Sequence, residues 1–266
     1  MESPPVPLTA PSRLGSFPWI RVATVLIALG LWQLAATLGR FPEWVLPPPS
    51  LVFERLLEMG RSGQLVRGVG MSMLRLVAGY LIAVVIGLPL GLALARYRMA
   101  RETVGTFVLG MQALPSICWL PLALLWFGLS EAAILSVTVL GAALAITLSA
   151  ESAVRNVPPV LIRAARTMGI TGVRLQTRVV LPASLPELVS GARLAWTIAW
   201  RSLMAAELLF FNGGLGQLLT VGRDLNDLAM VLAVMGVIVA LGLLVERVAF
   251  TPLQTTLAIR WGRHRA

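Results

Sequence analysis

The sequence predicts an all-α membrane protein with about six transmembrane helices, and three observations lead to that prediction. Of the 266 residues, 57% are hydrophobic and only 13% are charged, and the mean hydropathy is +0.83. A soluble domain keeps roughly a quarter of its residues charged. The apolar residues form several uncharged runs close to the about 20 residues that a helix needs to cross a bilayer. The 22 basic residues, all arginine, lie mostly between these runs.

The N-terminal part predicts a tail, a first span and an interfacial helix. Residues 1–17 are proline-rich, which is typical of a flexible tail. The run 22–39 is longer than the apolar core of a usual signal peptide, so we expect an uncleaved first span. The stretch that follows contains Pro47, Pro48 and Pro49 and predicts an extended approach, then a short amphipathic helix at the outer interface.

Five further spans complete the predicted transmembrane domain, which covers residues 18–250 and leaves 251–266 as a basic tail. The segment 188–211 is interrupted by Arg193, Arg201 and Glu207, but its other residues are overwhelmingly apolar, so it counts as a span. Prolines inside the third span predict kinks, used either for gating or for packing. Gly87 and Gly91 predict a close helix crossing. The five spans are expected at 76–95, 103–130, 132–150, 188–211 and 228–245.

Arginine placement predicts the orientation. If the N-terminus is inside, fourteen of the 22 arginines fall on the cytoplasmic side, as positively charged loops generally do. Both termini are therefore expected in the cytoplasm of a multi-pass plasma (inner) membrane protein. The net charge of +10 is then mainly an orientation signal. We expect no nucleic-acid partner.

The sequence offers little chemistry for catalysis. The single histidine is His264 and the single cysteine is Cys118, so no cluster of metal ligands or paired nucleophile and base is visible. A phosphate-binding Walker A loop requires a lysine, and the sequence contains none. We therefore expect a chain that is not an enzyme and binds no cofactor itself.

One basic connection, residues 156–182, has features of a short docking helix. Asn156 is a candidate N-cap, Pro158 and Pro159 fit a first helical turn, and Gly169 fits a C-terminal stop, which predicts a helix over 158–168. A second helix should begin at Thr171 and end near Leu181, because Pro182 follows. The first helix carries arginines opposite its apolar arc. That pattern suits either an amphipathic loop on anionic lipid or a helix that docks into another protein. The arc consists of Val160, Leu161, Ala164, Ala165 and Met168.

The same connection resembles the signature loop of permease subunits of ATP-binding-cassette (ABC) importers. In that loop Glu-Ala-Ala, three residues, Gly, nine residues, Ile, any residue and Leu-Pro follow in order. Here Arg163-Ala164-Ala165, Gly169, Val179 and Leu181-Pro182 keep every spacing, with Arg163 in place of Glu and Val179 in place of Ile. "SMLRLVAGYLIAVVIGLPLGLALA", "LPSICWLPLALLWFGLSE" and "NGGLGQLL" extend the similarity to sulfonate, taurine and nitrate permeases.

The resemblance implies a type I importer permease with a cytoplasmic coupling helix. Two permease copies, expected as a homodimer, would enclose the pathway. Two separate ATPase subunits would hold ATP and Mg, and an extracytoplasmic binding protein would deliver sulfonate, taurine, nitrate, bicarbonate or a similar small anion. An arginine at position 163 would need an acidic or neutral partner on the ATPase. The residues that the motif assigns to ATPase coupling are Arg163, Ala164, Ala165, Met168, Gly169, Leu181 and Pro182.

Polar residues within the predicted spans are candidates for the translocation pathway, because charges inside a membrane are costly. Helical geometry places Arg193, Trp196, Trp200, Met204 and Glu207 in one narrow arc. Glu207 could instead bond an arginine on a neighbouring span, such as Arg75. An ATP-independent secondary transporter or channel is the alternative function, although the loop spacing would then be unexplained. The pathway candidates are Arg75, Gln112, Trp119, Trp200, Arg201, Met204 and Glu207.

Overall fold

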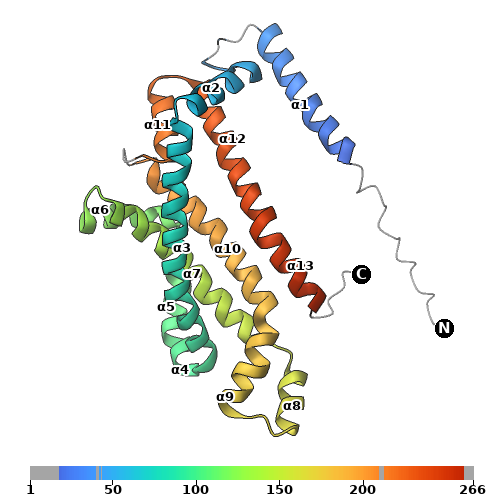
Figure 1. Ribbon diagram of the computed structural model, residues 1–266. Helices are drawn as coiled ribbons and strands as arrows, with labels where there is room; N and C mark the ends of the chain where they lie inside the picture. The colour runs from blue at the N-terminus through green and yellow to red at the C-terminus, as the bar shows by residue number, and fades with distance from the viewer. Residues whose placement is uncertain (1–17, 40–41, 43, 210–212, 261–266) are drawn as a thin grey trace, which may run out of the picture.

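A computed structural model describes residues 18–39, 42, 44–209 and 213–260, and throughout these residues the regular structure is helical. The predicted tail 1–17 and residues 261–266 lie outside the described residues. Figure 1 shows an elongated helical molecule with α2 at one end and the short helices α8 and α9 at the other. The α-helices are α1 (Pro18–Leu38), α2 (Pro49–Arg61), α3 (Gln64–Arg96), α4 (Arg98–Ala100), α5 (Thr106–Gln112), α6 (Leu120–Phe127), α7 (Glu131–Arg155), α8 (Pro159–Thr167), α9 (Gly172–Leu175), α10 (Leu181–Glu207), α11 (Leu215–Asp224), α12 (Leu228–Val245) and α13 (Thr251–Arg260).

The core lies where α3, α7 and α10 pack together, and small residues permit the close contact. Gly87 and Gly91 of α3 lie against the backbone of α7; a Cβ at Gly87 would be 2.6 Å from the Ala143 carbonyl oxygen. Ala195 and Ala199 of α10 are fully buried in the same core. The predicted close crossing at Gly87 and Gly91 is therefore confirmed.

Helix α3 begins twelve residues before the predicted start of the second span at residue 76. The prediction began the span after Arg75, because a charge inside a membrane helix is unfavourable. In the structure the Arg75 side chain is only 4% exposed and its charge is compensated by acidic residues from other helices, so the helix continues through it.

The third predicted span, 103–130, is not one straight helix. The segments Arg98–Gln112 and Ser116–Phe127 are bent by 98° relative to each other. Pro115 has extended backbone angles, φ −54° and ψ 135°, at the break, and a proline cannot donate the hydrogen bond that would continue the helix. A 3-10 turn, Ser116–Trp119, then leads into α6, which projects sideways from the bundle (Figure 1).

The number of spans depends on how the irregular helices are counted. Three helices of the described residues, Gln64–Arg96, Glu131–Arg155 and Leu228–Leu257, are long and apolar enough to cross a membrane, and the bent pair would make a fourth. The apolar part of α1, Val22–Leu38, is shorter. Helix α10 has 27 residues and carries the predicted charges. With α1 and α10 the fold contains the helices of the six predicted spans, and the all-α membrane fold class is confirmed.

Two helices continue where the sequence analysis predicted a boundary. A π-helical turn, Gln176–Val180, joins α9 to α10, so Pro182 lies in the first turn of α10 and does not end a helix. A second π-helical turn, Glu246–Phe250, joins α12 to α13 and precedes Pro252 in the same way. The wider π turn re-aligns the carbonyl groups that the proline ring would otherwise meet. The predicted tail boundary at residue 251 therefore falls inside a continuous helix.

The α2 end is held by polar contacts. The predicted amphipathic helix is present as α2, which buries Met59 against α11 and α12. The Arg55 guanidinium lies 2.9 Å from an Asp227 carboxylate oxygen, and Asp227 also caps α12 by accepting a bond from the Met230 N–H. The hydrogen bond to Glu58 and the charge of Asp227 raise the pKa of Arg55 above its usual value. Helix α1 lies away from the bundle (Figure 1) and is tied to α2 by a bond from the Ser50 N–H to Gln33.

Candidate functional site

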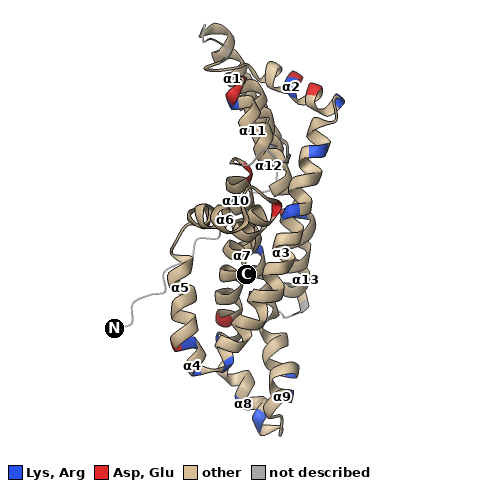
Figure 2. Cartoon of the chain, turned by 90° about the vertical axis from the view of Figure 1, so that its left-hand side faces the viewer, with Lys and Arg blue, Asp and Glu red and all other residues tan. Residues whose placement is uncertain are grey.

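Helix α8 is the centre of the connection between α7 and α10, at the end of the molecule where arginines predominate (Figure 2). It spans Pro159–Thr167, close to the predicted 158–168. The predicted cap is wrong: the Asn156 amide donates instead to Ser152 Oγ at 3.1 Å and to Glu187 Oε1 at 2.7 Å. Asn156 follows the last residue of α7, so its side chain reaches sideways to α10 and not forward to the first turn of α8.

The C-terminal end of α8 is set by Gly169, as predicted. Gly169 has φ +78°, a conformation that side chains with a Cβ rarely adopt. Its N–H donates to the Arg166 carbonyl at 2.9 Å, and the Ile170 N–H donates to the Ala165 carbonyl at 2.9 Å. This pair of bonds is a Schellman motif, which satisfies the last carbonyl groups of the helix and reverses the chain.

The two alanines of the loop have different surroundings. Ala165 is 2% exposed and packs in a small cluster with Val157, Leu175 and Val180. Ala164 is exposed. The predicted apolar arc is therefore divided: Ala165 fixes α8 to its own chain, while Val160, Leu161 and Met168 are 58%, 44% and 71% exposed.

The remaining coupling candidates lie in two places. Arg163 is exposed and lies on the solvent side of α8, within about 100° of Val160 and Ala164 around the helix axis. Within the described part of the chain no acidic group lies within ion-pair distance of Arg163. Leu181 and Pro182 begin α10 beyond the π turn and are not part of the exposed face of α8.

A buried ion network occupies the opposite end of the core. The Arg75 guanidinium lies 3.0 Å from Glu207 Oε1 and donates to the Gly213 carbonyl at 2.8 Å. Its Nε donates to Glu131 at 2.6 Å, and Glu131 is the first residue of α7. Three helices, α3, α7 and α10, therefore meet at one guanidinium. Glu207 was predicted either to line the pathway or to bond an arginine such as Arg75, and the structure contains the contact with Arg75.

Glu207 also anchors the glycine-rich turn that follows it. Its 0% exposed carboxylate accepts bonds from the Ser72 hydroxyl at 2.7 Å and from the Gly216 N–H at 3.1 Å. Gly214 has φ +104°, and a Cβ there would lie 2.6 Å from both carboxylate oxygens. The conformational freedom of Gly214 therefore allows the chain to wrap around a buried acid.

The residues of the predicted arc on α10 make contacts inside the chain, whereas Arg201 lies about 80° from Arg193 around the helix. Trp200 and Met204 pack against the buried core clusters. Trp196 contacts Tyr80 and Phe250, with ring centroids 5.0 and 6.2 Å away. Arg201 is exposed, and no acidic side chain among the described residues pairs with it.

Arg193, which the sequence placed on the same arc, is paired within the chain. Its guanidinium lies 2.7 Å from a Glu246 oxygen and donates to Gln254 at 3.3 Å, which links α10 to the α12–α13 helix. Its role in the described chain is therefore a contact between helices.

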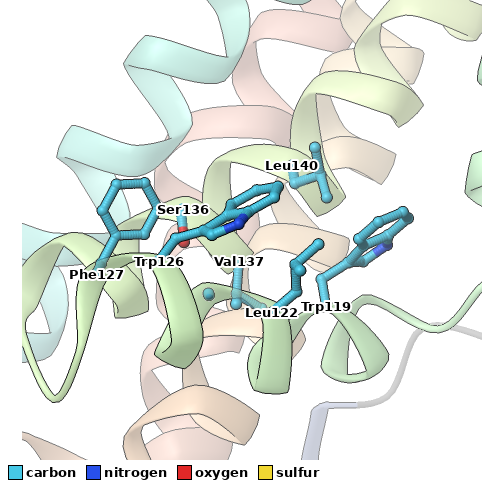
Figure 3. Close-up of a pocket in the computed structure, with 8 residues that line it drawn as sticks. Trp119, Leu122, Trp126, Phe127, Ser136, Val137 and Leu140 are labelled. Carbon is cyan, nitrogen blue, oxygen red and sulfur yellow. The ribbon is translucent and has the colours of Figure 1, made fainter.

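Gln112 and Trp119 lie on the two sides of the break. Gln112 ends α5, and Trp119 is the last residue of the 3-10 turn. Figure 3 shows Trp119 and Trp126 beside a small apolar cavity of about 80 Å³, which α7 completes with Ser136, Val137 and Leu140. The Ser116 hydroxyl at the break lies 2.7 Å from the Ser202 hydroxyl of α10. The break is thus fixed to α10 beside Arg201.

Sequence reasoning missed two members of the ion network. Ser72 lies one helical turn before Arg75, and its Oγ also accepts from the Leu215 N–H at 2.8 Å. Glu131 looked like an ordinary boundary residue. A serine one turn from a charged residue inside an apolar run was the available signal for Ser72, since polar groups in a membrane helix must find partners.

Comparison with known proteins gives a consistent result. Residues 66–251 match the family model described as binding-protein-dependent transport system inner membrane component. The chain is 32% identical to a putative ABC transporter permease protein of Methanocaldococcus jannaschii over 86% of this chain and 87% of that protein. It is 30% identical to the taurine transport system permease protein TauC of Escherichia coli, over 85% and 84%. It is also 30% identical to the putative aliphatic sulfonates transport permease protein SsuC of Escherichia coli, over 91% and 92%.

A solved structure agrees with these relatives. An inward-facing structure of the MetNI methionine ABC transporter contains a chain with a TM-score of 0.65 and 26% identity, over 73% of this chain and 96% of that one. The family match covers well over half of the chain and includes the α8 loop, the buried ion network and the break. The chain therefore belongs to the binding-protein-dependent transport system inner membrane components, a family of multi-pass ABC importer permeases, and within it resembles the taurine and sulfonate permeases.

Proposed function

We propose that this chain is the membrane-spanning subunit of an importer that moves a small anion, of the sulfonate or taurine type, into the cell. An extracytoplasmic binding protein delivers the anion, and separate ATPase subunits bind ATP and Mg and hydrolyse the ATP. Two copies of this chain surround the pathway. The substrate class follows from the relatives named as taurine and aliphatic sulfonate permeases.

The exposed face of α8 is the observation that carries the proposal. A nine-residue helix at the arginine-rich end holds Ala165 inward and leaves Val160, Leu161 and Met168 outward. A soluble neighbour with an apolar groove would bury these side chains. With α8 and both termini on the cytoplasmic side, as the arginine distribution predicts, the ATPase is the partner that can reach this helix.

A change on this face should detach the ATPase. Leu161→Glu places a carboxylate in the docking contact, and an unpaired charge in an interface should reduce co-purification of the ATPase at least about tenfold. Val173→Glu is a matched control: Val173 is 77% exposed on neighbouring α9, and an acid in the first turn of a helix is tolerated. Equal loss in both variants would show that α8 is not the specific docking element.

Reconstitution tests the transport function itself. Proteoliposomes that hold this chain, its ATPase and its binding protein should accumulate radiolabelled taurine or an alkanesulfonate only when ATP is supplied. A stable preparation of the chain without ATPase that carried the same substrate without ATP would support a secondary transporter or channel and contradict the proposal.

Arg163 gives a prediction about the partner. Because it is exposed beside Val160 and Ala164, it would contact the surface that receives α8. We expect a compensating acidic or neutral residue on the ATPase. Arg163→Glu should then reduce ATP-dependent uptake about tenfold, since it would place either two like charges or an unpaired carboxylate in the interface. Normal coupling of this variant with the native ATPase would contradict the compensation.

A further inference from the structure

A groove runs between α7 and α10. It has a volume of about 410 Å³, and the end of α5 closes one side of it. Many of its groups are polar, although α7 and α10 are membrane helices. The lining residues are Gln112, Ala145, Leu148, Ser149, Ser152, Glu187, Ser190, Gly191 and Leu194.

Helix periodicity extends this groove toward the break. On α10, Arg201 follows Leu194 by seven residues and Ser190 by eleven, close to two and three full turns, so all three share one side of the helix. On α7, Leu148 and Ser152 follow Gly141 at the same intervals. The two stripes meet the break in the membrane helix at their far end, because a Cβ at Gly141 would lie 2.7 Å from Ser202 Oγ and 3.1 Å from Ser116 Cβ.

Two features at this far end require water or a polar partner. Residues Ala113, Leu114 and Pro115 at the break are exposed. An interrupted helix at membrane depth is tolerated only where protein covers it or water fills a cavity. Arg201 is exposed on the same side without an acidic partner among the described residues, and charged groups inside membranes face aqueous cavities or bundle interiors. Both features indicate that the stripe is hydrated.

The groove also contains hydrogen-bond donors that the fold does not use. The Ser190 hydroxyl donates to the Pro186 carbonyl at 3.0 Å. The Ser149 hydroxyl and the Gln112 amide donate to no acceptor among the described residues. The Ser152 hydroxyl accepts from Asn156 and keeps its own hydrogen to donate. Sulfonate oxygens are acceptors only, so donor groups of this kind suit them.

The one acid of the groove lies at its α8 end. Glu187 accepts from Asn156 at 2.7 Å, and fourteen residues, about 21 Å of helix rise, separate it from Arg201. The positive group is therefore at the break end of the stripe, and the negative group is at the α8 end.

We propose that this stripe is the anion's route between the break and the α8 end, with Arg201 attracting the oxyanion and Gln112, Ser149 and Ser152 donating hydrogen bonds to it. This inference deepens the proposed function and rests on it for the direction of transport. Arg201, the donors and the broken helix are then parts of one hydrated path.

Cysteine accessibility tests the path without requiring transport. In a Cys118→Ala background, Ser149→Cys, Ser190→Cys and Thr197→Cys are made in the assembled complex and treated, in open membrane fragments, with MTSES, a thiol reagent that is itself a sulfonate. Only ionised, water-exposed thiols react, so these positions should react at least about tenfold faster than Leu243→Cys, an exposed apolar site on α12. Rates equal to that of Leu243→Cys would overturn the inference, whether or not the complex imports its substrate with ATP.

The role of Arg201 has its own measurement. Thr197 lies one turn from Arg201 on an exposed part of α10, so the two side chains are neighbours. Removing the charge by Arg201→Gln should lower the ratio of the anionic MTSES rate to the cationic MTSET rate at Thr197→Cys about threefold or more, and Arg201→Lys should preserve the ratio. An unchanged ratio in Arg201→Gln would mean that the charge is neutralised by another group, such as an acid of the second copy, and would overturn the anion role.

Discussion

Glu207→Ala is expected to destabilise the chain by about 3 kcal/mol or more, because it removes one ionic partner of the buried Arg75 guanidinium. Arg75 is only 4% exposed and Glu207 is 0% exposed, so water cannot replace the missing carboxylate. The same change removes the acceptor for the Ser72 hydroxyl and the Gly216 N–H. Tryptophan fluorescence during thermal unfolding in detergent should show a large fall in the midpoint.

Two further variants separate the charge from the general effect of a mutation. In a double-mutant cycle, Arg75→Ala combined with Glu207→Ala should cost clearly less than the sum of the single changes, since the second change removes a charge that the first left unpaired. The exposed pair Arg223–Asp224 is the matched control, and Arg223→Ala should change stability by less than about 0.5 kcal/mol. Strict additivity of the Arg75 and Glu207 changes would show that the pair does not interact in the folded chain.

The position of this network explains why so much stability depends on it. Arg75 joins α3 to the start of α7 through Glu131 and to the end of α10 through Glu207, while Gly213 ties in the following turn. Ser72 continues the connection to the N–H of Leu215 at the start of α11. The buried network of Arg75 and Ser72 therefore fixes the relative positions of four helices at the end opposite α8. Movements of α8 would act against this fixed end.

Local rules predicted the α8 loop well. Gly169, the length of the helix and the exposed positions of Leu161 and Met168 depend on the spacing of a few neighbouring residues, and each follows from backbone geometry. The Asn156 cap was wrong because the Asn156 amide donates to Glu187, 31 residues away, and this bond holds the side chain away from the first turn of α8. The burial of Ala165 was also not predictable from the helix alone, since Leu175 and Val180 across the turn produce it.

The positions where prolines disturb the helices could be predicted, but the resulting backbone geometry could not. Pro115 was expected to kink the third span, but a sequence does not reveal that the kink reaches 98° and turns α6 out of the bundle. Pro182 was expected to end a helix, whereas a π turn immediately before it allows the helix to continue. Both outcomes depend on what the neighbouring helices pack against, and that information is tertiary.

Ion pairs between charged residues also could not be predicted from the sequence. A pairing of Arg75 with Glu207 was one of two interpretations, because residues 132 positions apart cannot be matched by spacing. Glu131 and Ser72 were not recognised at all, because their significance depends on α3 and α10 meeting the start of α7. Arg201 was recognised as unusual, and helix periodicity places it on the same side of α10 as the groove residues Ser190 and Leu194.

The close crossing of α3 and α7 gives the second large effect. Gly91→Ala should destabilise the chain by about 1–3 kcal/mol, since the new methyl group would lie 2.7 Å from the Ala150 Cβ and overlap the Thr147 carbonyl oxygen, which forces the helices apart. Gly70→Ala on the same helix has open space within 4 Å and should instead stabilise the chain by about 0.5–1 kcal/mol, because alanine favours a helix over glycine. Stability changes of opposite sign for the same glycine-to-alanine change on one helix would identify the crossing as the cause. The unfolding midpoints of the two variants measure these stability changes. A gain in stability for Gly91→Ala would show that α3 and α7 do not approach so closely at this position.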